Sequence, residues 1–211
     1  MAAATARLLA SADSLDDDAV RAPSLLPGWT RGHVLSHLAR NADGMARTAR
    51  GVLAGVPAPM YDSAEAREAA IEQGAGRPAA EIADDVRRSA EGLAPVLAEL
   101  AGAGEEVLGS LVLFGPPQLG RVPDQPARSL LFGRLREVEV HHVDLGLPSY
   151  RPPDWPAAFV ERTLLWVHAR TGPIDVVGEP AEVLAWRIGR GAGPSVRRLD
   201  GSEPGDPPAG W

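Results

Sequence analysis

The sequence predicts a mainly α-helical protein: a four-helix bundle over residues 1–150, followed by a small α+β domain over residues 151–211. One observation behind this prediction is that long segments with apolar residues at helical spacing alternate with loops rich in glycine and proline. Another is that strand-like alternation is rare before residues 150–156, where a proline-rich stretch marks a change in composition. Long helices joined by modest loops favour a bundle.

The helical segments of the first domain are recognised by their spacing and by their ends. Leu8, Leu9 and Leu15 recur at near-helical spacing in the first segment. Thr30 and Ser63 can cap the second and third segments, because their hydroxyl groups can accept a free backbone N–H of the first turn. The predicted segments are 4–20, 31–53, 64–73, 79–101 and 133–145.

Two features interrupt this helical pattern. Pro95 lies inside the fourth segment, where it should kink or break the helix because proline lacks a backbone N–H. Residues 102–126 are rich in glycine and proline and contain one apolar run, 107–114, which we interpret as a short strand or a buried loop.

The last part of the chain has a different pattern. We expect helices at 159–169 and 180–189, with a β-branched run at 174–177 and a possible strand at 195–199. A unit of this size is marginal as an independent fold, so we expect it to pack on the bundle.

The composition excludes several classes of protein. The chain of 211 residues has no cysteine, so disulfides and thiolate–metal sites are excluded and any metal must bind His, Asp or Glu. A net charge of −7 without a basic cluster argues against nucleic acid as a partner. No apolar run reaches the length of a membrane span, and the first residues lack a secretory pattern. We therefore expect a cytoplasmic protein that does not bind a membrane.

Glu137 and His141 form the first chemical motif. They are i and i+4 neighbours, so on a helix one carboxylate and one imidazole reach the same point in space. The surrounding positions are apolar almost all round, which is typical of a buried helix. Buried ionisable groups need partners, and a divalent metal would satisfy both. The alternative is an ordinary hydrogen bond between the two side chains.

His33 and His37 form the second motif, again at i and i+4. The apolar arc of that segment contains Val34, Leu35, Leu38, Ala42 and Met45. His37 lies beside this arc and His33 lies further round towards solvent, so His37 is the better candidate to point inward. The alternative is a half-buried His37 bonded to a backbone carbonyl.

The two motifs together indicate more than either does alone. One histidine from the second bundle helix and a Glu/His pair from the last can build a metal site from facing helices. Three ligands of this kind, His37, Glu137 and His141, leave an open position, as in catalytic zinc sites.

Four pieces of the sequence carry a resemblance to a known family. They are Leu-Pro-Gly-Trp-Thr-Arg-Gly-His-Val-Leu-Ser-His-Leu-Ala-Arg-Asn-Ala-Asp at 26–43, Pro-Met-Tyr at 59–61, Gly-Ala-Gly-Arg-Pro-Ala-Ala-Glu at 74–81, and Leu-Arg-Glu-Val-Glu-Val-His-His-Val-Asp-Leu at 135–145. In this order they resemble the mycothiol-dependent maleylpyruvate isomerase family, which belongs to the DinB-like metalloenzyme superfamily. Residues 177–190 resemble the C-terminal domain of that family, where a Gly-Arg closes a similar helix. The stretch before them is shorter than usual.

The resemblance implies a DinB-like four-helix bundle in which His37, Glu137 and His141 bind a divalent metal, with zinc the expected ion. It implies a low-molecular-weight thiol cosubstrate, mycothiol, and a role in aromatic degradation. The reaction it implies converts maleylpyruvate to fumarylpyruvate by thiolate addition, bond rotation and elimination.

A dianionic substrate of this kind needs cations, and guanidinium groups suit planar carboxylates. Arg190 is the preferred catalytic residue because it ends the family-like run, and further candidates for substrate binding are Arg67, Arg77 and Arg134.

The remaining polar residues near the motifs have other expected roles. His33 and His142 fall outside the metal ligands, and His142 is expected to be a core histidine with a hydrogen-bonded ring. His168 is read as structural. Asp144 either orients a ligand ring as a hydrogen-bond acceptor or is an ordinary polar residue near the helix end.

Two other functions stay open at this point. The same site would suit a mycothiol S-transferase that acts on another electrophile, and the bundle could be a non-catalytic metal-binding module. The expected partners are a small dicarboxylate or other electrophile and a low-molecular-weight thiol. The sequence does not distinguish a monomer from a homodimer.

Overall fold

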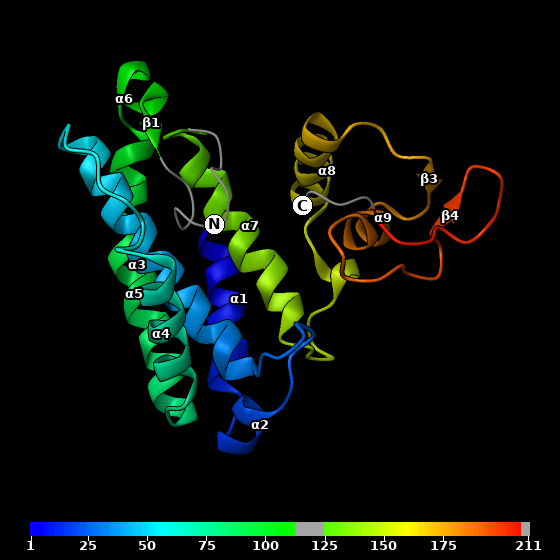
Figure 1. Ribbon diagram of the computed structural model, residues 1–211, viewed down its shortest axis with the longest axis horizontal. Coiled ribbons are helices and arrows are strands. Elements are labelled where there is room, and N and C mark those ends of the chain that lie inside the picture. Colours follow the sequence, from blue (N-terminus) through cyan, green and yellow to red (C-terminus); the bar gives the residue numbers. More distant parts are fainter. Residues whose placement is uncertain (113–124, 208–211) are drawn as a thin grey trace. The chain divides into compact units, whose positions relative to one another are not determined.

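The computed structural model describes residues 1–112 and 125–207 of the chain (Figure 1). It is mainly helical, as the sequence predicts. The chain divides into two compact units, Met1–Leu145 and Gly146–Trp211. The division falls a few residues before the boundary expected at residue 150. No helix in the described part of the chain combines the length and the apolar character that crossing a membrane requires.

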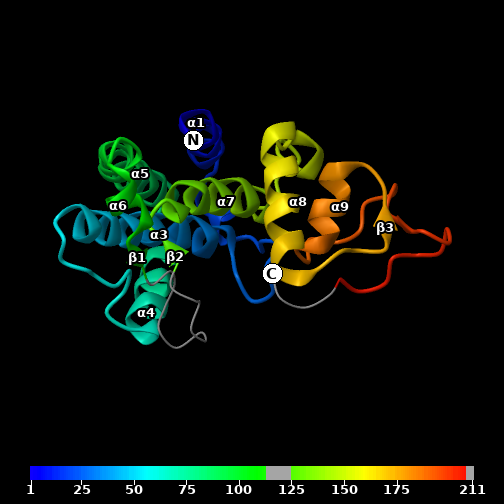
Figure 2. The ribbon, with the colours of Figure 1, turned by 90° about the horizontal axis from the view of Figure 1, so that it is seen from above.

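Four helices of the first unit pack around a common core. Helix α3 contacts α5 and α7, and α1 contacts the same two helices. Helix α4 packs along α3, and in Figure 2 it lies on the opposite side of α3 from α1. The helices of this unit are α1 Ala2–Asp13, α2 Asp17–Arg21, α3 Arg31–Leu53, α4 Ala64–Ala75, α5 Ala79–Ala101, α6 Glu105–Gly109 and α7 Ser129–Asp144.

Helix α3 forms as the sequence predicts. The Thr30 side chain accepts a hydrogen bond from the backbone N–H of His33, and the His33 ring accepts one from the backbone N–H of Thr30, which makes a capping box. The predicted apolar arc is buried against the neighbouring helices, with Val34, Leu38 and Met45 fully inaccessible to solvent.

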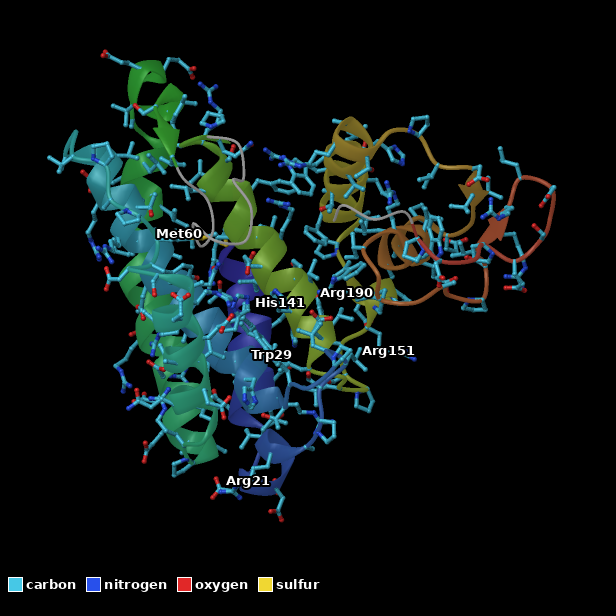
Figure 3. All side chains as sticks on the ribbon, viewed as in Figure 1. Arg21, Trp29, Met60, His141, Arg151 and Arg190 are labelled. Carbon is cyan, nitrogen blue, oxygen red and sulfur yellow. The ribbon has the colours of Figure 1, made fainter. Side chains whose placement is uncertain are left out.

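Gly44 on α3 allows a loop to approach the helix closely. A Cβ atom at this position would lie 2.9 Å from the backbone oxygen of Met60. Met60, labelled in Figure 3, is buried against the helix. This approach fixes the loop that carries Tyr61, the next residue, beside α3.

The predicted extent of the first helix is wrong. Residues 4–20 do not form a single helix, because α1 ends at Asp13 and α2 begins at Asp17. The Asp16 side chain accepts a hydrogen bond from the backbone N–H of Ala19 at 2.8 Å and caps α2. A short carboxylate that bonds to the nearby backbone competes with helix continuation.

The expected break at Pro95 does not occur, because α5 runs from Ala79 to Ala101 without interruption. Pro95 lies on the exposed face of the helix. The carbonyl of Glu91, which loses its helical donor, is on the same exposed face and can bond to water.

The apolar run at 107–114 is partly helical, which the sequence did not predict. Helix α6 includes its first residues, and strand β1, Leu111–Val112, follows. Strand β1 pairs antiparallel with β2, Gln125–Pro126, with Leu111 opposite Pro126. Leu113 and Phe114 lie outside the described residues.

The second unit has the α+β character that the sequence predicts. Its elements are the 3-10 helix η1 Pro152–Asp154, the helices α8 Ala157–Thr171 and α9 Pro180–Arg187, and the strands β3 Val176–Val177 and β4 Arg197–Arg198. The two strands pair antiparallel, and helix α8 contacts α9. A small core of Val176, Val183, Trp186 and Val196 joins the strands to α9.

Candidate metal centre

The structure brings His37, Glu137 and His141 together. His37 comes from α3, whereas Glu137 and His141 lie one turn apart on α7. The Nε2 atom of His37 is 3.1 Å from Oε2 of Glu137, and Nε2 of His141 is 3.7 Å from the same oxygen. One candidate ligand atom from each residue lies within 4.8 Å of the others. The two imidazole rings meet edge to face, with centroids 4.6 Å apart.

This arrangement fits a divalent metal ion. Ligand atoms about 2.0–2.2 Å from a tetrahedral zinc ion are roughly 3.3 Å from one another, close to the two separations between ring nitrogens and Oε2. Two imidazoles and one carboxylate are an N/O donor set that suits zinc, and a fourth position would stay open.

Burial and neighbouring charges set the protonation of two of the three side chains, His37 and Glu137. Burial lowers the pKa of His37 to about 4. Burial alone would raise the pKa of Glu137, but the hydrogen bond with His37 and the charges of His37, His141 and Arg134 lower it to about 2. At neutral pH the site therefore presents a carboxylate and a neutral His37 imidazole, as metal binding requires.

Asp144 lies behind His141. Its Oδ2 atom is 2.8 Å from Nδ1 of His141, and the side chain is fully buried. A carboxylate at this nitrogen holds the imidazole with Nε2 directed at the cluster. Of the two roles that the sequence left open for Asp144, this contact favours the orientation of the ligand ring.

Arg67 on α4 lies behind His37. Its Nη2 atom donates to Nδ1 of His37 at 3.0 Å, and its guanidinium lies over the Tyr61 ring, 5.7 Å from the centroid. Tyr61 is itself affected by this environment, because burial raises the pKa of its hydroxyl.

Arg67 also lines a pocket of about 210 Å³ on the side of α3 that faces α4. Two further arginines line it, and both are paired with acidic side chains. Arg40 pairs with Asp43 and Asp85, and Arg47 pairs with Asp62. The complete lining is Arg40, Asp43, Gly44, Arg47, Met60, Tyr61, Asp62, Ala66, Arg67 and Ala70.

Arg134 lies one turn before Glu137 on α7 and is almost completely buried. Its Nη1 atom donates to the backbone oxygen of Leu38 at 3.0 Å and to Oδ1 of Asn41 at 2.8 Å. Its Nη2 atom is buried and has no hydrogen-bond partner among the described residues. Burial lowers the pKa of Arg134 to about 10, and the positive charge contributes to the low pKa of Glu137.

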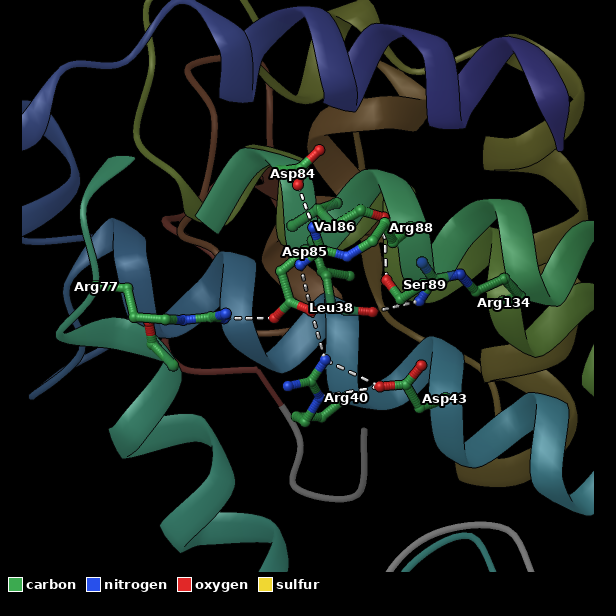
Figure 4. A network of polar contacts seen from close by, with 11 residues as sticks. Leu38, Arg40, Asp43, Arg77, Asp84, Asp85, Val86, Arg88, Ser89 and Arg134 are labelled. Carbon is green, nitrogen blue, oxygen red and sulfur yellow. Dashed lines mark hydrogen bonds and ion pairs between the residues drawn. The ribbon is translucent and has the colours of Figure 1, made fainter. Parts of the chain in front are cut away.

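Arg77 belongs to a different network, which Figure 4 shows. Its guanidinium pairs with Asp85 of α5 and donates to the backbone oxygen of Gly74 at 3.2 Å. Arg40 of α3 binds the same carboxylate at 2.8 Å. Burial opposes ionisation of Asp85, but the bonds from Arg77 and Arg40 lower its pKa. These contacts tie the α4–α5 connection to α3.

Arg190 lies in the second unit, directly after α9. Its backbone N–H donates to the oxygen of Ala185 at 2.8 Å, and Nη1 donates to the oxygen of Ile188 at 2.7 Å. Arg190 thereby closes the end of the helix, at the Gly-Arg that the sequence singled out (Figure 3).

The other histidines differ in their surroundings. His142 is a core histidine, as predicted, and its Nε2 atom is 2.8 Å from the Ser11 hydroxyl. His33 is half-buried: it caps α3 and also bonds to Glu72 at 3.0 Å. His168 lies on α8, where its Nε2 atom is buried without a partner among the described residues.

Sequence reasoning missed two aromatic residues near the cluster. The Trp29 ring lies 5.7 Å from the His37 ring and 6.1 Å from the His33 ring (Figure 3). Tyr61 lies beneath Arg67. Both residues occur in the family-like motifs, so the motifs marked their segments, but loop geometry decides that their rings reach this site.

The fold and the three converging side chains define a mainly helical protein with a candidate His/Glu/His metal site. The chain belongs to the mycothiol maleylpyruvate isomerase family, whose N-terminal domain model matches residues 1–146. The family predicted from the sequence motifs is therefore confirmed, and the chain is an isomerase-like enzyme.

Two solved structures have the same fold as this chain. The crystal structure of a mycothiol-dependent maleylpyruvate isomerase is 25% identical, with a TM-score of 0.82 over 97% of this chain and 92% of that chain. A structure of a histidine-to-alanine mutant of mycothiol-dependent maleylpyruvate isomerase is 24% identical, with a TM-score of 0.81 and the same coverage. No match to a curated protein sequence was found.

Proposed function

We propose that the chain is a metal- and thiol-dependent cis–trans isomerase that converts maleylpyruvate to fumarylpyruvate, with mycothiol as the thiol cosubstrate. The observation that carries this proposal is the convergence of His37, Glu137 and His141 in a chain of the maleylpyruvate isomerase family. We assign the four packed helices α1, α3, α5 and α7 to a DinB-like four-helix bundle, with the ligands on two facing helices.

The donor set supports a divalent ion, and zinc is the ion we expect. When bound, the ion would lower the pKa of a thiol at its open position, as it does for water. Within the chain, Asp144 would hold the His141 ring in place, and the charge of Arg134 would favour the ionised form of Glu137.

The reaction requires a sulfur nucleophile from outside the chain, because the sequence has no cysteine. A thiolate adds to one alkene carbon, and the electron pair of the double bond moves towards the neighbouring carbonyl. The resulting single bond rotates. Elimination then breaks the carbon–sulfur bond, restores the double bond in the trans geometry and returns the thiolate. The thiol is not consumed, and no oxidant or reductant is needed.

The substrate carboxylates require cations, for which we propose Arg67 and Arg134. We propose Arg190 as the catalytic arginine because it ends the family-like run of the second unit. Arg67 suits this role because it bonds to His37, a candidate metal ligand, and also lines a pocket. Arg134 carries a buried guanidinium nitrogen without a partner among the described residues. Arg77 is a weaker candidate because Asp85 already holds its guanidinium.

The test is an absorbance assay with purified protein, zinc, mycothiol and maleylpyruvate. We expect turnover only when both metal and thiol are present. Equal turnover with and without thiol would contradict the mechanism.

Two other outcomes of the assay would contradict the isomerase proposal and identify a different function. Conjugation of mycothiol to a generic electrophile, with no isomerisation, would identify an S-transferase. Bound zinc without turnover of any thiol adduct would identify a non-catalytic metal-binding module.

A further inference from the structure

The two histidines of the cluster differ at their second ring nitrogen. Nδ1 of His141 faces the carboxylate of Asp144, which is an acceptor. Nδ1 of His37 faces the guanidinium of Arg67, which has only donors. A histidine that binds a metal usually donates its other N–H to an acceptor, so only His141 has the expected arrangement.

The contact with Arg67 fixes the tautomer of His37. Because the guanidinium can only donate, Nδ1 must accept and the ring proton must be on Nε2. That proton points to Oε2 of Glu137, 3.1 Å away.

Metal binding requires the opposite tautomer. The Nε2 atom of His37 is the atom that converges with Glu137 and His141, so the ion takes its lone pair. A neutral ring then carries its proton on Nδ1, where it faces the N–H groups of Arg67. Two donors cannot bond to each other, so the Arg67 contact and the metal exclude one another.

The pocket beside Arg67 provides a place for the released guanidinium. Arg40 and Arg47 in its wall are each paired with carboxylates. Arg67 has no carboxylate partner in the part of the chain that the structure describes, and its guanidinium already lies over the ring of Tyr61. It is therefore the cation of this pocket that remains available to an anionic ligand.

We propose that Arg67 is a metal-dependent anion-binding residue: metal at His37 releases its guanidinium, which then binds a carboxylate of the substrate in the pocket beside Tyr61. This inference rests on the proposed function, and it adds the position of one substrate carboxylate and an order of events. The metal binds first and the dicarboxylate second. The ring proton of His37 moves from Nε2 to Nδ1 through solvent, so the change releases no net proton.

The tautomer can be observed directly in the unmodified protein. Long-range ¹H–¹⁵N NMR spectra of the histidine rings should show His37 protonated at Nε2 without metal and at Nδ1 after zinc is added. His141 should be protonated at Nδ1 in both states. A His37 ring already protonated at Nδ1 in the metal-free protein would overturn the proposal.

The second measurement is zinc affinity, obtained by competition with a chelator. The Arg67→Ala variant no longer opposes the metal-binding tautomer, so it should bind zinc roughly tenfold more tightly than the parent, as expected for loss of one charge-assisted hydrogen bond. Arg47→Ala removes the same charge from the same pocket and should change zinc affinity by less than about threefold. An equal gain in both variants would indicate general electrostatics and would overturn the proposal.

The third measurement is binding of succinate, a dicarboxylate that cannot add a thiolate. Zinc-loaded parent protein should bind it at least about tenfold more tightly than metal-free protein, and Arg67→Ala should lose that gain. Arg47→Ala should keep most of it. Unchanged succinate binding in Arg67→Ala would overturn the inference while leaving the metal site intact. Failure of zinc to bind the parent protein at all would instead contradict the proposed function.

Discussion

Two acid–histidine pairs on helix α7 have the same side chains and different surroundings. Glu137 and His141 face α3, where they meet a third ligand candidate, His37. Glu139 and His142 face α1, where Arg7 binds the Glu139 carboxylate at 2.8 Å and the Ser11 hydroxyl lies 2.8 Å from the His142 ring. Both pairs lie on the same helix, so the helix that each pair faces decides its role.

The difference teaches how a buried polar pair becomes a candidate site. Helix α1 offers a cation to the acid and a hydroxyl to the imidazole, and each of these contacts is 2.8 Å long. Helix α3 offers a second imidazole, and one candidate ligand atom from each of the three side chains lies within 4.8 Å of the others. A pair whose partners complement it is structural, whereas three metal-ligating side chains that converge on one point fit a metal ion.

The largest effect should come from removing the carboxylate of the first pair, Glu137. Glu137→Gln should weaken zinc binding by more than about a hundredfold, beyond the range typical of residues behind the ligands, because a neutral amide loses the charge attraction to the ion. Chelator competition and metal content after dialysis measure this effect.

The matched variant is Glu139→Gln, which removes the same charge two residues further along α7. It should keep zinc affinity within about threefold and lose stability instead, because Arg7 no longer faces the negative charge of Glu139. Since the Arg7 side chain is 38% exposed, we expect only about 1–2 kcal/mol. Full metal occupancy in Glu137→Gln would remove the distinction between the two pairs.

The next largest effect concerns Asp144, whose carboxylate bonds to His141 of the first pair. Asp144→Asn should weaken zinc binding by about ten- to a hundredfold, the usual cost of losing a carboxylate behind a ligand histidine. The amide can still accept from Nδ1 of His141, but it adds no negative charge to the ring. Calorimetric titration with zinc checks this prediction. Zinc affinity equal to that of the parent would reduce Asp144 to a residue that only closes the end of the helix.

Much of this organisation could be predicted from the sequence. The helical period located α3 and α7, and Thr30 marked the start of α3 correctly. The i, i+4 spacing put Glu137 beside His141, and the apolar arc separated His37 from His33. These features are local, so the sequence near each residue determines them.

The features that could not be predicted depend on segments far apart in the chain. Nothing near Glu139 indicates Arg7, and nothing near His37 indicates Arg67, since those contacts arise only when whole helices pack. The break of the first helix at Asp16 was missed for a different reason: the capping bond to Ala19 outweighs a leucine spacing that favours continuation.

His142, the histidine of the pair that faces α1, should contribute to the pH dependence of the free energy of unfolding. Burial lowers the pKa of His142 to about 4 from its ordinary value of 6.5. Below pH 6.5 the unfolded chain binds a proton that the folded chain does not, so this contribution to stability is present above pH 6.5 and is lost between pH 6.5 and 4. At about 1.4 kcal/mol per pKa unit, the loss is of the order of 3 kcal/mol.

The measurement is the free energy of unfolding in urea at several pH values. His142→Gln keeps a hydrogen-bonding side chain but cannot titrate, so its stability should fall less steeply between pH 6.5 and 4 than that of the parent. Parallel pH curves for the two proteins would contradict a neutral His142 in the folded state.

The smallest effect concerns His33, which shares α3 with His37 but bonds to Thr30 and Glu72 instead of the cluster. His33→Ala should keep zinc affinity within about twofold, because neither partner is a metal ligand. It should lower the free energy of unfolding by about 1 kcal/mol, since half of the capping box is lost and Thr30 keeps its own bond to the backbone. Thr30→Ala should give a similar loss and serves as the control. Zinc release from His33→Ala comparable to that from His37→Ala would show that both histidines of α3 serve the site, and the contrast between them would fail.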